Sequence, residues 1–244
     1  VRRAPQRGVV VVFAVLVVAG AASTATWMLA QQSATLNQTA LAASRAQADL
    51  YAQAGLDWGR GILAEDARSG TVDTLDEAWA RPLVGLPVER AIVSGAIADQ
   101  QSRYNLNNLV KDGRRSDADV RILSRLLDAL ALEPSLALAV LDWVDGDADL
   151  AGSGGAEDPY YLALARPYRA ANRPLAQVEE LYGVRGFDAK AVARLRPFVT
   201  ALPARTPVNA NTAAPEVLGA ILPELSREEI GELAASRRAK PFKD

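Results

Sequence analysis

The sequence predicts an α+β fold in which a long N-terminal helix precedes a small antiparallel sheet and an inserted all-α domain. Three observations predict this arrangement. Residues 9–30 form an uncharged apolar run, residues 87–109 carry strand and turn signals, and residues 116–198 contain four helical runs that begin at a proline or a capping residue. The chain has 244 residues, which is enough for one large or two small domains.

The composition excludes several classes of chemistry. The chain contains no cysteine and no histidine, so disulfides, thiolate zinc sites, thiol nucleophiles and histidine bases are all ruled out. The formal net charge is −2, and charges of both signs are mixed along the chain. This balance argues against a surface built to neutralise nucleic-acid phosphates. Nothing else in the sequence resembles an enzyme, and we expect a protein that is not one.

The N-terminus has the pattern of a membrane anchor. Residues 1–8 carry three arginines and no acid, and after Arg7 the next charge is Arg45. The 22 residues of the run 9–30 would span about 33 Å as a helix, close to the hydrocarbon thickness of a bilayer. The arginines place the N-terminal side in the cytoplasm, and Trp27 occupies a position typical of an interfacial aromatic.

Two other interpretations of this segment remain open. A cleaved secretory signal peptide has the same order of charges, and residues 19–22 resemble an Ala-x-Ala cleavage site, although its apolar core is shorter, about 7–15 residues. A buried core helix is the other alternative, but so long an uncharged run is unusual in a soluble domain.

The helix is predicted to continue beyond the membrane to residue 63. Apolar residues recur every three or four positions, with one gap, which predicts a single stripe that packs on a globular domain. Residues 9–63 would form one rod of about 80 Å. The stripe consists of Leu36, Ala40, Ala43, Leu50, Ala54, Trp58 and Ile62.

A basic leader ending in Gly8, followed by an apolar and then an amphipathic helix, resembles the type IV pilin and pseudopilin superfamily. The resemblance implies cleavage by prepilin peptidase between Gly8 and Val9, and methylation of the new N-terminus. Most members carry glutamate at the fifth mature position, which is Phe13 here. In lacking this glutamate, the chain resembles the minor pseudopilin K family of the type II secretion system. In other members the glutamate pairs with the amine of the subunit above, and a subunit at the filament tip has none above it.

Residues 64–110 are expected to form a pilin-like α/β region. Residues 64–86 resemble an irregular connection, and residues 91–98 predict a short hairpin that turns at Ser94-Gly95. The stretch 99–109 resembles the D-x-x-x-R-x-N-L-N-x-L pattern of the K family. The alternative is that these residues form an ordinary strand and turn, which would have the same sequence pattern.

Residues 111–203 are expected to form the inserted helical domain. Its four helices would begin at Ser116 or Asp117, at Pro134, at Pro174 and at Asp188.

Residues 204–244 would return to the pilin-like region. We expect a strand over 206–212 and helices over 215–222 and 226–235, the last with a capping box. Members of the K family usually continue with further strands of the pilin sheet, so we expect either a short member of the family or a sequence that stops before those strands.

An acidic loop between the second and third of these helices is the candidate metal site. Six carboxylates fall within seventeen residues that contain no lysine or arginine, and crowded like charges need a counter-charge. Calcium suits such a loop, because it accepts six to eight oxygens in irregular geometry. The spacing copies only the start of an EF-hand, since Leu150 replaces the required glycine. The candidate ligands are Asp142, Asp145, Asp147, Asp149, Glu157 and Asp158.

The alternative for this loop is a solvated acidic surface without metal. The stretch also resembles the K family through D-W-x-D-x-D, G-A-E-D-x-Y-Y and Asn172-Arg173-Pro174. The resemblance implies calcium binding in the helical domain, because known members bind calcium there.

Two C-terminal segments also resemble DNA-binding proteins. Residues 178–203 have a helix, a glycine turn and a helix, and residues 207–218 resemble helix-hairpin-helix DNA-binding proteins, whose turn amides contact phosphate. This predicts a membrane-anchored DNA-uptake protein, but the basic residues here are countered by acids, and a packing unit of the same shape is the simpler interpretation.

The resemblance to the K family extends from Arg7 to about Ala235. It implies a single-pass protein of a bacterial inner membrane, with its N-terminus in the cytoplasm and its globular part in the periplasm. It also implies that the chain assembles with minor pseudopilins I, J and H and is processed by prepilin peptidase. No binding to nucleic acid is expected. The expected function is to form the tip of the pseudopilus and help initiate its assembly for protein export.

Overall fold

The computed structural model describes residues 7–89 and 91–243, with side chains from residue 9 onward. The chain divides into two compact units. The first comprises Val1–Gly61 and Leu83–Gly95, and the second comprises Ile62–Pro82 and Ala96–Asp244. Helices, short strands and turns are combined, which confirms the predicted α+β class.

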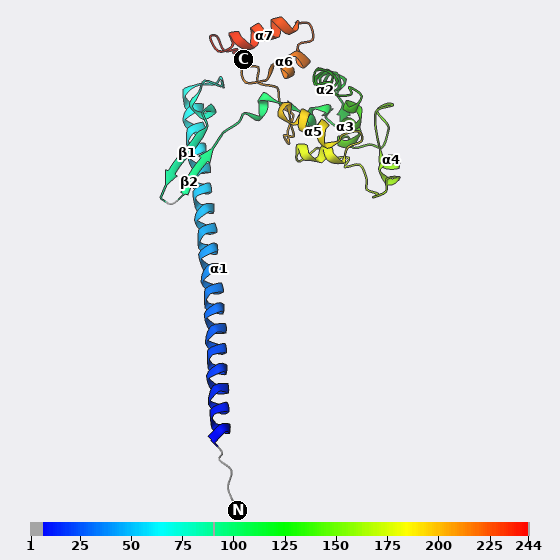
Figure 1. Ribbon diagram of the computed structural model, residues 1–244. Helices are drawn as coiled ribbons and strands as arrows, with labels where there is room; N and C mark the ends of the chain where they lie inside the picture. The colour runs from blue at the N-terminus through cyan, green and yellow to red at the C-terminus, as the bar shows by residue number, and fades with distance from the viewer. Residues whose placement is uncertain (1–6, 90, 244) are drawn as a thin grey trace, which may run out of the picture. The chain divides into compact units, whose positions relative to one another are not determined.

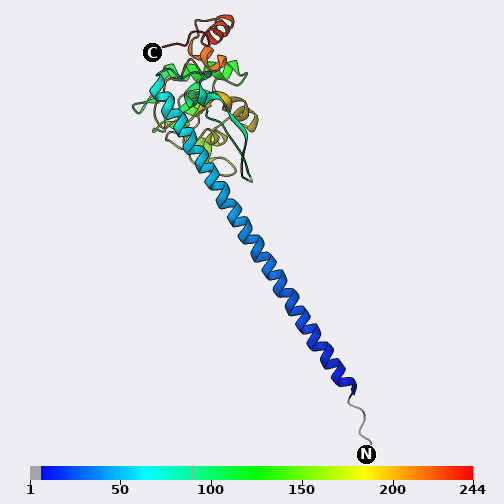
Figure 2. The same cartoon turned by 90° about the vertical axis from the view of Figure 1, so that its left-hand side faces the viewer.

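The helix α1 runs without a break from Arg7 to Ser69, as Figures 1 and 2 show. Its N-terminal part is long and apolar enough to cross a membrane. Every side chain from Val9 to Leu50 is exposed. Five hydroxyls in this part, those of Ser23, Thr24, Thr26, Thr35 and Thr39, bond back to carbonyls three or four residues earlier, for example Ser23 to Ala19 at 2.8 Å.

The first unit also contains a hairpin of β1 (Leu83–Val88) and β2 (Ala91–Gly95), paired antiparallel. The predicted turn at Ser94-Gly95 is wrong, because the strands connect after Val88 instead. Residues 83–86 were assigned to an irregular connection, because Gly85 and the neighbouring Pro87 are unusual within a strand. Gly85, with φ of 70°, lies at an irregularity of the register, and proline is tolerated in a strand at a sheet edge.

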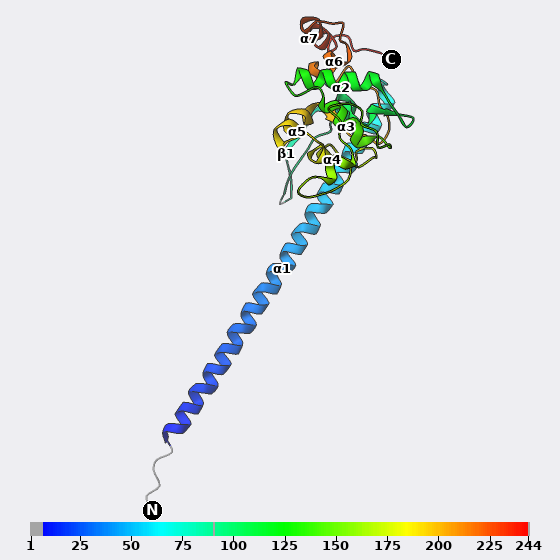
Figure 3. The same ribbon diagram turned by 90° about the vertical axis from the view of Figure 1, so that its right-hand side faces the viewer.

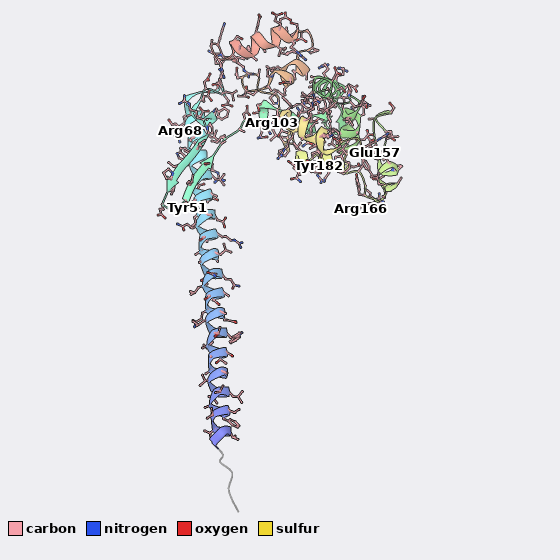
Figure 4. The ribbon with its side chains drawn as sticks, viewed as in Figure 1. Tyr51, Arg68, Arg103, Glu157, Arg166 and Tyr182 are labelled. Carbon is pink, nitrogen blue, oxygen red and sulfur yellow. The ribbon has the colours of Figure 1, made fainter. Side chains whose placement is uncertain are left out.

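Tyr51 links α1 to this hairpin. Its hydroxyl donates to Glu89 Oε2 at 2.8 Å, and Gln47 Nε2 donates to the same oxygen at 3.2 Å; Figure 4 shows Tyr51 beside the hairpin. The predicted apolar stripe is wrong for this part of the helix, because Leu50 is 68% exposed and Trp58 54% exposed. The half-buried residues here are Tyr51, Gly55, Gly59 and Ile62, so the predicted stripe is correct only at Ile62.

The second unit contains the globular core. The helix α2 packs against α3 and α6, and α6 packs against α7, an arrangement visible in Figure 3. Buried side chains from these elements and from the loops between them form one hydrophobic cluster. The helices are α2 (Asp117–Ala129), α3 (Leu136–Val144), α4 (Asp158–Leu162), α5 (Ala189–Leu195), α6 (Pro215–Ile221) and α7 (Arg227–Ser236).

Short 3-10 turns and two-residue strands connect these helices. The strands β3 and β6 pair in parallel, and β4 and β5 pair antiparallel. The strands are β3 (Tyr104–Asn105), β4 (Val110–Lys111), β5 (Arg114–Arg115) and β6 (Val199–Thr200). The 3-10 turns are η1 (Ala78–Ala80), η2 (Gln100–Ser102), η3 (Leu106–Leu109), η4 (Val178–Gly183) and η5 (Arg196–Phe198).

Three asparagines after Tyr104 hold distant segments together. Asn107 donates to the carbonyls of Leu175 and Leu202, both at 2.9 Å, and accepts the Leu175 N–H at 2.8 Å. Asn108 exchanges two bonds with the backbone of Thr206 in the same way. Buried amide side chains thus replace the backbone partners that a longer sheet would supply.

The predicted N-terminal capping residues of two helices are confirmed. Asp188 accepts the N–H of Ala191 at 2.7 Å, and Ser226 forms a capping box with Glu229. The segment after Pro174 forms the 3-10 turn η4 rather than an α-helix.

The strand predicted over residues 206–212 is absent from the described part of the chain. Asn209 turns the backbone there, because its side-chain oxygen accepts the N–H of Asn211 at 3.0 Å.

Candidate metal centre

The acidic loop begins at the last turn of α3. That helix is apolar and almost completely buried, so Asp142 and the capping residue Asp145 enter the protein interior with it. Asp142 is fully buried, and its Oδ1 accepts the Ala151 N–H at 3.0 Å. The other oxygen, Oδ2, has no hydrogen-bond partner among the described residues.

Three carboxylates converge in this loop. One oxygen each of Asp145, Asp147 and Glu157 lies within 4.8 Å of the others. Asp145 is 7% exposed and Glu157 2% exposed, whereas Asp147 lies at the surface. Both oxygens of Glu157 and Oδ1 of Asp145 have no hydrogen-bond partner among the described residues. Figure 4 shows Glu157 in the loop beside α4.

Burial and mutual repulsion disfavour the charged forms of these groups. Desolvation raises the pKa of Asp145 to about 7, with further contributions from the charges of Asp147 and Asp142. Desolvation also raises the pKa of Glu157 to about 7, followed by repulsion from Asp142 and Asp145. Burial likewise raises the pKa of Asp142 above its ordinary value. Such shifts are typical of carboxylates that have no counter-charge.

The nearby arginines do not neutralise the group. Arg185 donates to the Gly155 carbonyl at 2.7 Å, and Arg115 donates to the Ala151 carbonyl at 3.1 Å. Arg173 pairs with Glu180 instead. Within residues 9–89 and 91–243, no lysine or arginine forms an ion pair with the three converging carboxylates. A bound cation would supply the missing charge, so these residues fit a metal.

A glycine permits this close arrangement. A Cβ atom at Gly155 would overlap the Asp142 carboxylate. The missing side chain of Gly155 therefore leaves room for the carboxylate of Asp142.

Besides Asp142, two further predicted ligands lie outside the three converging carboxylates. Asp149 is exposed and its side chain is not among the three that converge. Asp158 accepts from Arg169 at 2.7 Å and from the Ala170 N–H at 3.1 Å, so its oxygens already have donors.

Asn172 was not predicted as a site residue. Its Nδ2 donates to the Asp147 carbonyl at 2.9 Å, and its buried Oδ1 has no hydrogen-bond partner among the described residues. The available signal was its place in the Asn172-Arg173-Pro174 stretch, which indicated family resemblance but no role.

A second acidic group has a different character. Asp66, Asp73 and Glu77 also bring one oxygen each within 4.8 Å, but Asp73 is exposed. Glu77 accepts from the Trp79 indole at 2.5 Å and from Thr74 at 3.2 Å. None of the three contributes a buried oxygen without a partner, in contrast to the acids of the loop.

The predicted processing residues lie at the start of α1. Gly8 and Val9 are both in the helix, and Val9 is 62% exposed. Residues 1–6 of the basic leader are outside the described residues.

The hairpin of the DNA-binding alternative is engaged within the protein. The Arg185 N–H donates to the Tyr161 hydroxyl at 3.2 Å, so a turn amide that phosphate would need already has an acceptor. At Gly186, a Cβ atom would overlap the Leu136 side chain, which shows how closely the turn packs on α3. These contacts favour the packing interpretation of the hairpin over phosphate binding.

Known proteins are similar to the chain over most of its length. A family model described as type II secretion system protein K matches residues 102–204. The type II secretion system protein K of Pseudomonas aeruginosa is 34% identical over 230 residues, which cover 90% of this chain and 69% of that protein. The protein of the same name from Klebsiella pneumoniae is 34% identical over 248 residues, covering 96% and 76% respectively.

A solved structure is similar as well. It is the crystal structure of the GspK-GspI-GspJ complex from the type 2 secretion system of enterotoxigenic Escherichia coli, which matches with a TM-score of 0.71 at 26% identity. The match covers 80% of this chain and 72% of the matched chain, which confirms the pilin-like fold. Sequence and structure agree that the chain belongs to the type II secretion system protein K family.

Proposed function

We propose that this chain is the minor pseudopilin that forms the tip of the periplasmic pseudopilus, where it helps initiate assembly for protein export. The observation that carries this proposal is the likeness, over four-fifths of the chain, to a structure solved as a complex with GspI and GspJ. The chain would accordingly assemble with minor pseudopilins I and J, and with H. Its role would be structural, without bond-making chemistry.

The exposed surface of α1 supports a single membrane span. An apolar helix whose side chains from Val9 to Leu50 are all exposed needs lipid or partner helices around it. Arginines precede it, which favours a cytoplasmic N-terminus in the inner membrane and a periplasmic globular part. Prepilin peptidase would cut between Gly8 and Val9.

Co-purification tests the assembly. The full-length chain is tagged, co-expressed with pseudopilins I and J of the same organism, and captured in detergent with and without a calcium chelator. We expect I and J to be captured together with the chain in at least one condition. Capture of an unrelated single-span protein with the same tag controls for adhesion to detergent micelles. Loss of both partners in both conditions would refute the proposed assembly.

We further propose that the loop carboxylates bind calcium. Asp145, Asp147 and Glu157 would hold the ion, and Asp142 would contribute negative charge from the buried side. When bound, calcium would neutralise carboxylates that otherwise repel one another in a buried position. Magnesium is a poorer fit, because it requires near-octahedral geometry and gives up its waters reluctantly.

Titration calorimetry on the full-length chain tests this site. We expect calcium to bind and magnesium to bind more weakly. Asp145→Asn should weaken calcium binding by 10-fold or more, because it removes a charged ligand. Asp149→Asn is the matched control, since it makes the same change in the same loop outside the group, and it should bind like the parent. Equal affinities of the two variants would refute the assignment.

A further inference from the structure

The hairpin of β4 and β5 has a turn that its sequence specifies closely. Asp112 and Gly113 form the turn, with φ of 52° and 73°. Both angles lie in the left-handed region, as in a type I′ turn, and Asp-Gly is one of the residue pairs that favour this turn. The hairpin is therefore a well-defined element, which holds the residues on either side of the turn in fixed positions.

The two faces of this hairpin have different surroundings. Val110 pairs with Arg115, and Lys111 pairs with Arg114. Because side chains alternate along a strand, each of these pairs occupies one face. Val110 is half-buried against the hydrophobic cluster, and Arg115 donates to the Ala151 carbonyl at 3.1 Å. The face that carries the other pair therefore points away from the core.

Two positive charges lie directly opposite each other on this outer face. Lys111 and Arg114 are both exposed, and within residues 9–89 and 91–243 neither side chain forms an ion pair or a hydrogen bond. Like charges at directly opposite positions are unfavourable for a hairpin. A neutral side chain at either position would remove this repulsion, so the hairpin itself gains nothing from the pair.

The pair also lines an open hollow of about 530 Å³. Its lining contains three positive side chains and one negative side chain, so an anion suits it. The planar guanidinium of an arginine matches a carboxylate with two parallel hydrogen bonds, and a lysine ammonium adds a compact charge beside it. The lining residues are Lys111, Asp112, Arg114, Arg115 and Ser116.

We propose that Lys111 and Arg114 form a docking point for an acidic segment of a partner protein, whose carboxylates they bind. A membrane surface fits less well, because residues 111–116 contain no apolar side chain that could enter a bilayer. The rigid turn positions both donors before the partner arrives, which lowers the entropy lost on binding. This surface is separate from the converging carboxylates and depends neither on calcium nor on the proposed position at the tip.

Binding of a fluorescent oligoglutamate peptide to the full-length chain in neutral detergent tests this surface. Fluorescence anisotropy measures the affinity, which we expect to fall as salt rises from about 50 mM to about 500 mM, because the contact joins exposed charges. The double substitution Lys111→Gln and Arg114→Gln should weaken binding by about 10-fold or more, since it removes both charged donors. No binding of the peptide by the parent at low salt would overturn the proposal.

The matched control is the double substitution Lys190→Gln and Arg194→Gln. These residues are exposed and lie four positions apart on α5, so the control removes the same two charges from one face of a helix. It should bind the peptide within about threefold of the parent. An equal loss of affinity in the two double variants would show only a general attraction between charges, and the proposal would then be wrong.

Thermal melting separates recognition from a role in folding. Removing the repulsion between Lys111 and Arg114 should leave the Tm of their double variant equal to that of the parent or higher. Lys111→Arg keeps both charges and should bind the peptide like the parent. A lower Tm of the double variant would mean that the two side chains stabilise the hairpin, which would overturn a role reserved for a partner.

Competition identifies the anion that the surface prefers. Glutarate, which carries two carboxylates, should displace the peptide at least as well as inorganic phosphate at the same ionic strength. Displacement by phosphate alone would assign the surface to phosphate groups, such as those of lipids, and would refute a protein carboxylate as the occupant.

Discussion

Replacing Glu157 by glutamine should affect the protein in opposite directions with and without calcium. Glu157 is 2% exposed, and neither oxygen has a hydrogen-bond donor among the described residues. Glutamine keeps the size of the side chain and removes its charge. Without calcium the substitution removes an uncompensated charge, and with calcium it removes a ligand.

The pKa of Glu157 sets the magnitude of the first effect. Burial raises it from 4.5 to about 7. The unfolded chain releases this proton near pH 4.5, whereas the folded chain holds it until about pH 7, so the calcium-free protein loses stability as pH rises through this window. At about 1.36 kcal/mol per pKa unit, the loss is about 3 kcal/mol above pH 7.

Thermal melting followed by near-ultraviolet circular dichroism measures the effect. In chelator at pH 8, Glu157→Gln should be more stable than the parent by up to about 3 kcal/mol, which corresponds to a rise in Tm of about 6–12 °C. At pH 4.5 or below the two proteins should melt together. Millimolar calcium should stabilise the parent at pH 8 and have little effect on the variant.

Glu133→Gln is the matched control, because Glu133 is exposed in the loop before α3. It should not change the dependence of Tm on pH or calcium. The reasoning is refuted if Glu157→Gln lowers Tm in chelator at pH 8, since Glu157 would then have a stabilising partner as a carboxylate.

Two substitutions test the packing around the site. Asn107→Ala removes three hydrogen bonds that reach Leu175 and Leu202 and should destabilise the fold by about 3 kcal/mol, measured by denaturant unfolding. Gly155→Ala should weaken calcium binding about 10-fold in titration calorimetry, because its Cβ would displace a buried carboxylate, whereas Gly146→Ala, with open space around its Cβ, should bind like the parent.

The sequence predicted the elements whose pattern is local. The capping residue Asp188 and the capping box of Ser226 were predicted correctly, because a cap depends on residues only three positions apart. The hairpin was misplaced because Gly85 and Pro87 resemble a connection, and only the pairing with β2 shows that they lie in a strand. The partly buried face of α1 was also misplaced, because spacing defines a face but does not show what covers it.

The candidate site, too, could be predicted only as far as residues close together in the sequence define it. The sequence showed that six carboxylates lack a local counter-charge, but not which of them converge. That depends on the path of the loop, which directs Asp158 toward Arg169 and brings Glu157 to Asp145. Asn172 was not predicted, because the sequence does not show what contacts the nitrogen and the oxygen of its side-chain amide.

A last prediction concerns the position of the chain in the filament. Phe13 is 65% exposed on α1, within the part of the helix expected in lipid. A carboxylate at this position costs about 2–3 kcal/mol in a bilayer unless a partner neutralises it. At the proposed tip no subunit lies above to supply that partner, so Phe13→Glu should reduce the membrane-bound fraction and fail to restore secretion in a strain lacking the chain. Phe13→Leu, which keeps the position apolar, should restore it. Full secretion by Phe13→Glu would mean that the carboxylate finds a partner, and the chain would then lie below another subunit instead of at the tip.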